Sequence, residues 1–211
     1  MQDLSRFQHP RFARAYDRMS RQAEATTGEL RARLLAGLSG RVLEVGAGNG
    51  LSFPHYPSGV REVVAVEPDD LLRAAAERAA ATAPVPVRVV PGHAGALPAE
   101  DGTFDAAVAS LVLCTVPDQA AALAELRRVL KPGGELRFFE HVRSGRPVRG
   151  LLQQLITPVW SLVAGGCHPA RDTAAAIAAA GLTIEEHDRF AHQPLPGSPR
   201  LTHILGRARR A

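Results

Sequence analysis

The residues with the clearest chemical meaning are a glutamate and three closely spaced glycines. Residues 43–50 read Leu-Glu-Val-Gly-Ala-Gly-Asn-Gly. Glycine lets backbone N–H groups approach a ligand with no Cβ in the way. The spacing is GxGxG instead of the GxGxxG of dinucleotide-binding proteins, and the preceding acid disfavours a phosphate but suits a cationic amino group. A plain tight turn is the alternative, whereas the cofactor interpretation predicts contacts from Glu44, Gly46, Ala47, Gly48 and Gly50.

A second acid follows at a spacing typical of ribose binding. Glu67 lies 21 residues after Gly46, directly after the apolar run Glu62–Val66. A carboxylate about 20 residues after such a turn can accept hydrogen bonds from ribose hydroxyls. Pro68 then forces a turn just behind it. We predict that Glu67 and Pro68 contact the cofactor, with a solvent-facing glutamate at a strand end as the alternative.

Two later loops complete the predicted cofactor site. Residues 91–98 (PGHAGALP) follow a strand signal and should lie beside the base of a nucleotide-type ligand, through His93 and Ala94. Residues 110–116 (SLVLCTV) end another strand on the same edge, which places Leu111 there.

Histidines are the candidates for moving a proton. His141 follows a strand at the predicted catalytic edge, and His168 lies in an irregular segment after Cys167. His93 is expected beside the base, and the remaining histidines are expected at surface or packing positions. Cys114 and Cys167 form no disulfide framework, and no Cys or His spacing indicates a metal site. We therefore expect no metal and a buried, packing role for Cys114.

Alternating strand and helix signals predict the elements that must position these residues. Strands are expected at 41–45, 62–66, 85–90, 104–109 and 135–140, with helices at 71–83, 118–130 and 172–180. Two final strands are expected at 182–190 and 203–207. Such alternation implies an α/β fold with a mostly parallel sheet and helices on both faces.

The two remaining segments should build the acceptor side. Residues 10–27 place apolar side chains on one helical stripe: Phe12, Ala15, Tyr16, Met19 and Ala23. Residues 145–170 break the alternation and carry Leu152, Ile156 and Trp160. We predict a small lipophilic acceptor that contacts Phe12, Tyr16 and Trp160; an apolar cover that only seals the cofactor from water is the alternative. The chain is then one domain, 1–211, with a helical cover (1–37) and an acceptor-side insertion (145–170).

Composition excludes several classes of protein. The chain has 211 residues, of which 45% are hydrophobic and 22% charged, as in a globular domain with a full core. The net charge is +4, and residues 1–41 hold eight arginines against four acids. No aromatic residues alternate with this charge, so no nucleic-acid partner is expected, while contact with an anionic membrane surface stays open. The sequence shows no apolar stretch long enough to span a membrane, and a cytoplasmic protein is expected.

Together these motifs resemble the class I methyltransferases that use S-adenosylmethionine (SAM). That group reads LEVGxGxG, an acid after the second strand, GxAxxLP and LRPGG, and residues 129–134 (VLKPGG) resemble the last motif. The resemblance covers roughly residues 7–206. It is most specific for the methyltransferase-like thiol S-methyltransferases, through the segments 53–57, 111–114, 139–142, 166–167 and 171–173. Those enzymes are membrane-associated in animals, and the N-terminal hydrophobic anchor they carry is not found in this sequence.

The resemblance implies a Rossmann-like, seven-stranded sheet whose last strand is antiparallel. It also implies that Glu44 and residues 46–50 hold the methionyl end of SAM and that Glu67 binds the ribose. One departure concerns the loop after the third strand, where the family has an acid and this chain reads Gly92-His93-Ala94-Gly95. His93 replaces that acid as a hydrogen-bond partner, or the loop only folds over the adenine.

Three functions remain open from the sequence. The first is methylation of a small thiol, and the second is O- or C-methylation of a phenol, quinone or natural product. The third is a SAM-binding module without catalysis.

Overall fold

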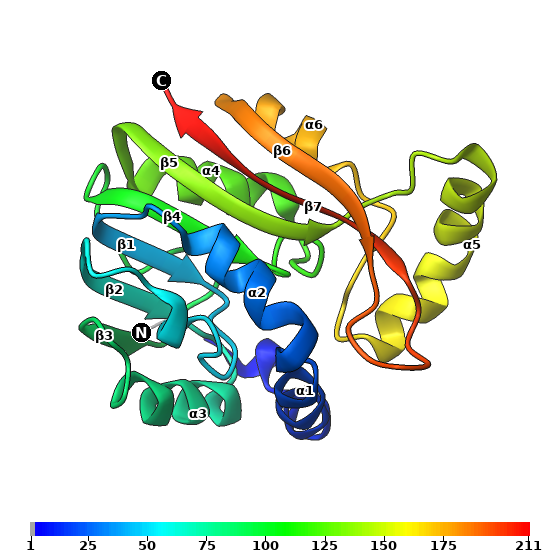
Figure 1. The fold of residues 1–211 in the computed structure, drawn as a ribbon, viewed down its shortest axis with the longest axis horizontal. Helices are drawn as coiled ribbons and strands as arrows, with labels where there is room; N and C mark the ends of the chain where they lie inside the picture. Colours follow the sequence, from blue (N-terminus) through cyan, green and yellow to red (C-terminus); the bar gives the residue numbers. More distant parts are fainter. Residues whose placement is uncertain (1–2) are drawn as a thin grey trace.

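A computed structural model describes residues 3–211 as one seven-stranded sheet with helices packed against it (Figure 1). The strand order is β3-β2-β1-β4-β5-β7-β6. Strands β1 to β5 pair in parallel, and β7 is antiparallel to both of its neighbours. The predicted Rossmann-like fold class and the antiparallel last strand are confirmed. The strands are β1 Gly40–Val45, β2 Val60–Val66, β3 Val87–Val90, β4 Phe104–Ser110, β5 Leu130–His141, β6 Leu182–His192 and β7 Leu201–Arg210.

Helices cover both faces of this sheet. Helices α2 and α3 contribute to the core on one face, and α4 and α6 pack on the other. Aspartate is the N-cap residue of three helices, α3, α4 and α6. The Asp118 side chain, for example, accepts a hydrogen bond from the Ala121 N–H (2.9 Å) at the start of α4. The helices are α1 Pro10–Gln22, α2 Glu24–Leu35, α3 Asp70–Ala80, α4 Gln119–Val129, α5 Pro147–Val163 and α6 Thr173–Ala179, with short 3-10 turns η1 Ser5–Phe7 and η2 Phe53–His55.

The order of the strands places the ligand crevice. The chain winds from β1 to β2 and β3 on one side, and then returns to β4 and β5 on the other side of β1. In such sheets the crevice opens at the carboxyl ends of the two strands where the winding reverses. Here these are β1 and β4, which end at the glycine turn and at Ser110.

The N-terminal cover differs from its prediction. Instead of one helix over 10–27 there are two, which meet at Ala23. The predicted stripe is shifted, because Met19 is exposed whereas Ala13 and Ser20 are buried. The Ser20 face is buried because of a polar contact, in which the Asn49 amide donates a hydrogen bond to the Ser20 hydroxyl (3.0 Å). Apolar periodicity cannot reveal a buried face that is partly made of hydrogen-bonding groups.

The segment expected to be irregular contains a helix of 17 residues, α5. It extends beyond the end of the sheet next to the β6–β7 loop (Figure 1). Its apolar side chains are largely open to solvent, with Leu155 68% and Leu162 85% exposed. Within residues 3–211, no helix combines the length and the apolar character that crossing a bilayer requires.

Candidate functional site

The glycine turn after β1 adopts a backbone that other residues rarely take. Gly46, Gly48 and Gly50 have φ angles of +62°, +58° and +80°, which place them in the left-handed region. The Gly46 N–H donates to the Val66 carbonyl oxygen (2.8 Å) and so ties the turn to the end of β2. A Cβ on Gly46 would lie 2.5 Å from a Val112 methyl group. The turn therefore requires glycine for its conformation and also for its close packing.

Glu44 is the last acid before this turn, and it is almost completely buried. The Tyr56 hydroxyl donates a hydrogen bond to its carboxylate (2.9 Å). Burial raises the pKa of Glu44 to about 7, which the hydrogen bonds from Ser52 and Tyr56 and the charge of Arg31 only partly oppose. A buried carboxylate of this kind gains from a cationic partner brought by a ligand.

Glu67 lies at the carboxyl end of β2 and organises the backbone around it. Its two carboxylate oxygens accept the N–H groups of Gly48 (2.7 Å) and Asp69 (3.0 Å). Burial raises the pKa of Glu67 to about 7 against these two bonds. An ionised carboxylate has about four lone-pair sites, so each oxygen keeps capacity for a ligand hydroxyl.

Glu44 and the first part of the glycine turn line a narrow cavity at the switch point, whereas Glu67, Gly48 and Gly50 lie outside its lining. The predicted cofactor residues Glu44, Gly46, Ala47 and Leu111 line it, together with Tyr16 and Arg31. Leu111 has a φ of +60°, unusual for a residue with a side chain, and its N–H donates to the Phe139 carbonyl oxygen (2.7 Å). Strained residues of this kind concentrate at ligand sites.

The loop after β3 meets the N-terminal residues. The rings of His93 and Phe7 stack with centroids 5.0 Å apart. The His93 Nδ1 accepts the Gly95 N–H (3.2 Å), and burial lowers the pKa of His93. The Pro68 carbonyl oxygen accepts the Gln8 amide (2.8 Å), while Ala94 is buried in the core. Glu67 therefore has several neighbours at its edge of the sheet. They are Pro68, the loop with His93 and Ala94, and residues 7 and 8.

The acceptor-side residues converge from two distant segments. The rings of Phe12 and Tyr16 stack with centroids 6.0 Å apart. Tyr16 lies over the glycine turn, 3.3 Å from where a Gly48 Cβ would be, and Phe12 fills the space of a Gly165 Cβ. Trp160 lies beside Cys167. The expected lining role of Leu152 and Ile156 does not match their positions, because both side chains are at least half exposed.

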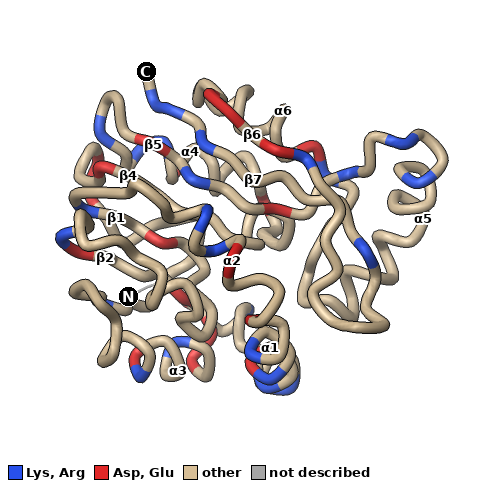
Figure 2. The backbone as a smooth tube through the Cα atoms, in the orientation of Figure 1, with Lys and Arg blue, Asp and Glu red and all other residues tan. Residues whose placement is uncertain are grey.

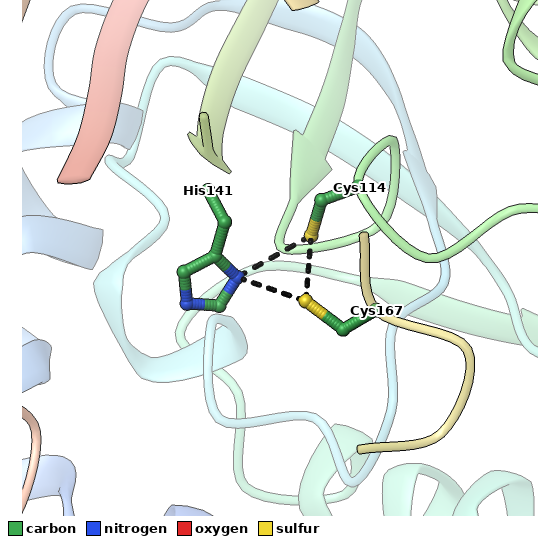
Figure 3. Close-up of side chains that lie close together, drawn as sticks. All are labelled: Cys114, His141 and Cys167. Carbon is green, nitrogen blue, oxygen red and sulfur yellow. Dashed lines mark hydrogen bonds between the residues drawn. The ribbon is translucent and has the colours of Figure 1, made fainter. Parts of the chain in front are cut away.

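His141, at the end of β5, lies in a buried group with both cysteines of the chain (Figure 3). Its Nδ1 lies 3.4 Å from the Cys114 sulfur and 3.5 Å from the Cys167 sulfur, and the two sulfurs are 3.9 Å apart. Burial lowers the pKa of His141, but the neighbouring Cys114 and Glu140 outweigh burial and raise it. His168 lies outside this group, with its Nδ1 hydrogen-bonded to the Gly166 carbonyl oxygen (2.6 Å).

Backbone contacts hold the loop that carries Cys114 in place. The fully buried Glu140 carboxylate accepts the N–H groups of Val112 (3.0 Å), Leu113 (2.9 Å) and Cys114 (3.0 Å). The Cys114 carbonyl oxygen accepts the N–H of His168 (2.7 Å), which ties the loop to the segment after α5. The position of Cys114 against His141 and Cys167 is therefore fixed by neighbours on both sides.

Several site residues carry no signal that sequence reasoning could use. Tyr56 reaches Glu44 from a loop, and Arg31 reaches the cavity from α2. The cysteines lie 53 residues apart in sequence, so no local spacing marks them as neighbours. For His141 the available signal was its place after a strand at the predicted catalytic edge, and Cys167 was marked only by the family resemblance at 166–167.

Comparison with known proteins defines the class of protein to which this fold belongs. A pattern described as a methyltransferase domain matches residues 43–138, which span the glycine turn, Glu67 and most of β5. A SAM-dependent methyltransferase from Thermotoga maritima superposes with a TM-score of 0.70 over 95% of this chain and 97% of its own, at 23% identity. The fold is that of a class I methyltransferase.

The relatives in sequence are more specific. The thiol S-methyltransferase TMT1B of Homo sapiens is 34% identical over 199 residues, which cover 90% of this chain and 80% of the relative. A demethylmenaquinone methyltransferase of Thermobifida fusca is 40% identical over 115 residues, 54% of this chain and 48% of the relative. The chain belongs to the SAM-dependent methyltransferases, in the family that includes the thiol S-methyltransferases.

The residues present fit the cofactor of this family. SAM carries an amino group, a ribose diol and a purine. Glu44 offers a buried acid in the cavity, and Glu67 keeps free lone pairs at the strand end. The chain is therefore a SAM-dependent methyltransferase, with one buried acid in the cavity and a second at the end of the neighbouring strand.

Proposed function

We propose that this enzyme methylates the sulfur of a small, lipophilic thiol. One observation carries the proposal: similarity to a thiol S-methyltransferase extends over 90% of the chain. The similarity to a quinone-type enzyme covers only 54%. An alignment of 199 residues must take in much of the proposed acceptor segments, 1–37 and 145–170, as well as the nucleotide-binding half. These segments are the ones expected to select the acceptor.

The cofactor side of the proposal assigns roles to named residues. SAM, when bound, supplies an activated methyl group on a sulfonium. Glu44 pairs with its amino group beside the backbone of Gly46, Ala47, Gly48 and Gly50. Glu67 binds the ribose hydroxyls, while Pro68 shapes the turn behind that carboxylate. His93, Ala94 and Leu111 border the base and the methionyl chain.

The acceptor side aligns the thiol and removes its proton. Phe12, Tyr16 and Trp160 provide apolar contacts, and alignment alone is worth about 7–11 kcal/mol in reactions of this type. His141 is the residue through which the thiol loses its proton, because it is half-buried on the acceptor side and Cys114 and Glu140 raise its pKa. His168 is the weaker candidate of the two, since its Nδ1 is already engaged by a backbone carbonyl.

A panel of acceptors tests the proposal. The protein is incubated with SAM and equal concentrations of alkyl thiols, phenols and quinols, and S-adenosylhomocysteine is quantified. Turnover highest with alkyl thiols is expected. Turnover confined to phenols or quinols would instead establish an O- or C-methyltransferase. Tight binding of S-adenosylhomocysteine by calorimetry with no product from any acceptor would indicate a non-catalytic SAM-binding module.

We also propose that α5 rests on an anionic membrane surface, where lipophilic acceptors concentrate. Eight large apolar side chains of α5, from Val148 to Val163, are at least half exposed. Figure 2 shows basic residues at the start of this helix and on the strand next to it. A cleft there is lined by Arg143, Arg171 and Arg189. Apolar area combined with cations is the pattern of interfacial helices.

Vesicle sedimentation tests this contact. The wild-type protein should pellet with vesicles that contain anionic phospholipid and stay in solution with neutral ones. The double variant Leu155→Gln, Leu162→Gln should stay in solution with both. Equal pelleting of the double variant and the wild type would remove α5 from the contact.

A further inference from the structure

The buried group of Cys114, His141 and Cys167 has the dimensions of a metal site. Tetrahedral zinc with Zn–S of about 2.3 Å and Zn–N of about 2.0–2.1 Å requires S···S separations of about 3.8 Å and S···N separations of about 3.5 Å. The structure has 3.9 Å between the sulfurs, and 3.4 and 3.5 Å from the sulfurs to the His141 Nδ1. All three edges of one tetrahedral face are present.

The chemistry of these ligand atoms favours zinc among the biological metals. Two soft thiolates with one imidazole form a set that catalytic zinc sites use, and such sites keep a fourth position open. Within residues 3–211, no other His, Cys, Asp or Glu atom joins the group. Two thiolates and one Zn²⁺ have no net charge, so this site can stay buried at low electrostatic cost.

The surroundings hold the group ready for a metal. Glu140 and the His168 N–H fix the loop of Cys114 from two directions. The Trp160 indole lies beside Cys167, and its buried Nε1 has no hydrogen-bond partner within the described part of the chain. Groups that orient and polarise ligand atoms in this way are typical of the outer layer of metal sites.

The site also borders the acceptor side. Cys114 lies three residues after Leu111, and Leu111 lines the cofactor cavity together with Tyr16. Gly166, next to Cys167, lies against the backbone of Thr115, next to Cys114. An open coordination position here would therefore be next to the residues proposed to hold the acceptor.

We propose that Cys114, Cys167 and the Nδ1 of His141 bind one Zn²⁺ whose open position takes the sulfur of the acceptor thiol. This inference rests on the proposed function, and in it His141 acts as a zinc ligand in place of taking up the thiol proton itself. A thiol that coordinates zinc is deprotonated outright, and its proton passes to solvent. The sulfur–methyl bond then forms as the methyl–sulfonium bond of SAM breaks, which leaves a thioether and S-adenosylhomocysteine. Zinc keeps its oxidation state throughout.

Metal content is the first test. Protein purified without chelators and reconstituted with Zn²⁺ should hold one zinc ion per chain. His141→Ala and Cys167→Ser should each weaken zinc binding by roughly 100-fold or more, because loss of outer-layer groups alone costs about 10–100-fold. His187→Ala, which alters an exposed histidine of β6, should bind zinc as the wild type does. Two free thiols with no zinc uptake would overturn the inference, as would a Cys114–Cys167 disulfide found after alkylation under denaturing conditions.

Cobalt substitution tests the open position on unmodified protein. Co²⁺ in the site should show thiolate charge-transfer absorption and the strong visible bands of a tetrahedral ion. Adding an alkyl thiol that is a substrate should shift these bands, and adding an alcohol of the same chain should not. An unchanged spectrum with the thiol would overturn coordination of the acceptor. This readout does not depend on turnover or on whether the variants fold.

A parallel assay separates the two proposals. Metal-free protein should still bind S-adenosylhomocysteine by calorimetry but should lose at least tenfold in thiol turnover, which Zn²⁺ restores. Full turnover by metal-free protein would overturn the zinc inference and leave thiol methylation standing. A normal cobalt spectrum that responds to thiols, with no methylation of any thiol, would support the metal site and reject the proposed function.

Discussion

The two ends of the active-site crevice are built in opposite ways. At the cofactor end, backbone groups and two buried acids are locked together by short-range contacts, such as the Gly48 N–H on Glu67 (2.7 Å). At the proposed acceptor end, α5 extends from the sheet (Figure 1), and Leu162 is 85% exposed. A rigid cofactor end can hold the same donor for every reaction, whereas an open acceptor end can change its partner. Four predictions test this contrast, from the largest expected effect to the smallest.

The first prediction concerns the packing of the cofactor end. Gly46→Ala should destabilise the protein by about 2–5 kcal/mol, because a left-handed backbone costs about 1–2 kcal/mol outside glycine and overpacking against Val112 adds about 1–3 kcal/mol. Gly102→Ala is the matched control: its φ is +59°, but a Cβ there meets nothing within 4 Å. Urea denaturation should therefore show the backbone cost alone for Gly102→Ala. Equal losses in both variants would mean that the close approach at Gly46 does not matter.

The second prediction removes a buried acid. Glu67→Ala should weaken S-adenosylhomocysteine binding by roughly 100-fold, because hydrogen bonds to a charged group are worth about 1.5–3 kcal/mol each. Glu77→Ala, on the exposed face of α3, serves as the control and should leave the affinity unchanged. Calorimetry measures both. An unchanged dissociation constant for Glu67→Ala would contradict the ribose role.

The same contrast explains what the sequence could reveal. Glu44, the glycine turn and Glu67 are close in sequence and lie at strand ends. Periodicity therefore predicted the fold class, which the sheet confirms, and spacing singled out these residues for the cofactor, which stays a prediction. The group around His141 depends on pairing β5 with a loop 26 residues away, and no local pattern encodes that contact. Helix α5 was missed because its Gly and Pro residues and its apolar run matched neither an amphipathic helix nor a strand. Most of its apolar side chains are exposed, so they do not repeat at the spacing of a buried helix face.

The third prediction uses the raised pKa values of the cofactor end. Glu44 and Glu67 both have a pKa of about 7 because they are buried. Both carboxyls become protonated as the pH falls, so affinity for S-adenosylhomocysteine should drop between about pH 8 and about pH 6, about tenfold for each carboxylate and about 100-fold for the two together. Stability of the ligand-free protein should change in the opposite sense. A folded-state pKa raised above the unfolded value of 4.5 contributes stability that is present at low pH and lost as the pH rises through about 7.

Calorimetry and thermal unfolding across this range check both directions. Glu44→Gln removes one of the two titrating groups and should flatten both profiles in part. A flat affinity profile in the wild-type protein would mean that the ligand does not require these carboxylates to be ionised.

The last prediction is a near absence of effect at the acceptor end. Leu162→Ala should change the free energy of unfolding by no more than about 0.5 kcal/mol, because an exposed side chain gives up little burial. Leu123→Ala in α4, where the side chain is fully buried, is the matched control and should cost about 2–5 kcal/mol. A large loss for Leu162→Ala would show that α5 packs against something in solution that covers its apolar face, such as a second copy of the chain. In that case the acceptor end would be covered in solution. The apolar side chains of α5 would then serve assembly of the protein and not contact with a membrane.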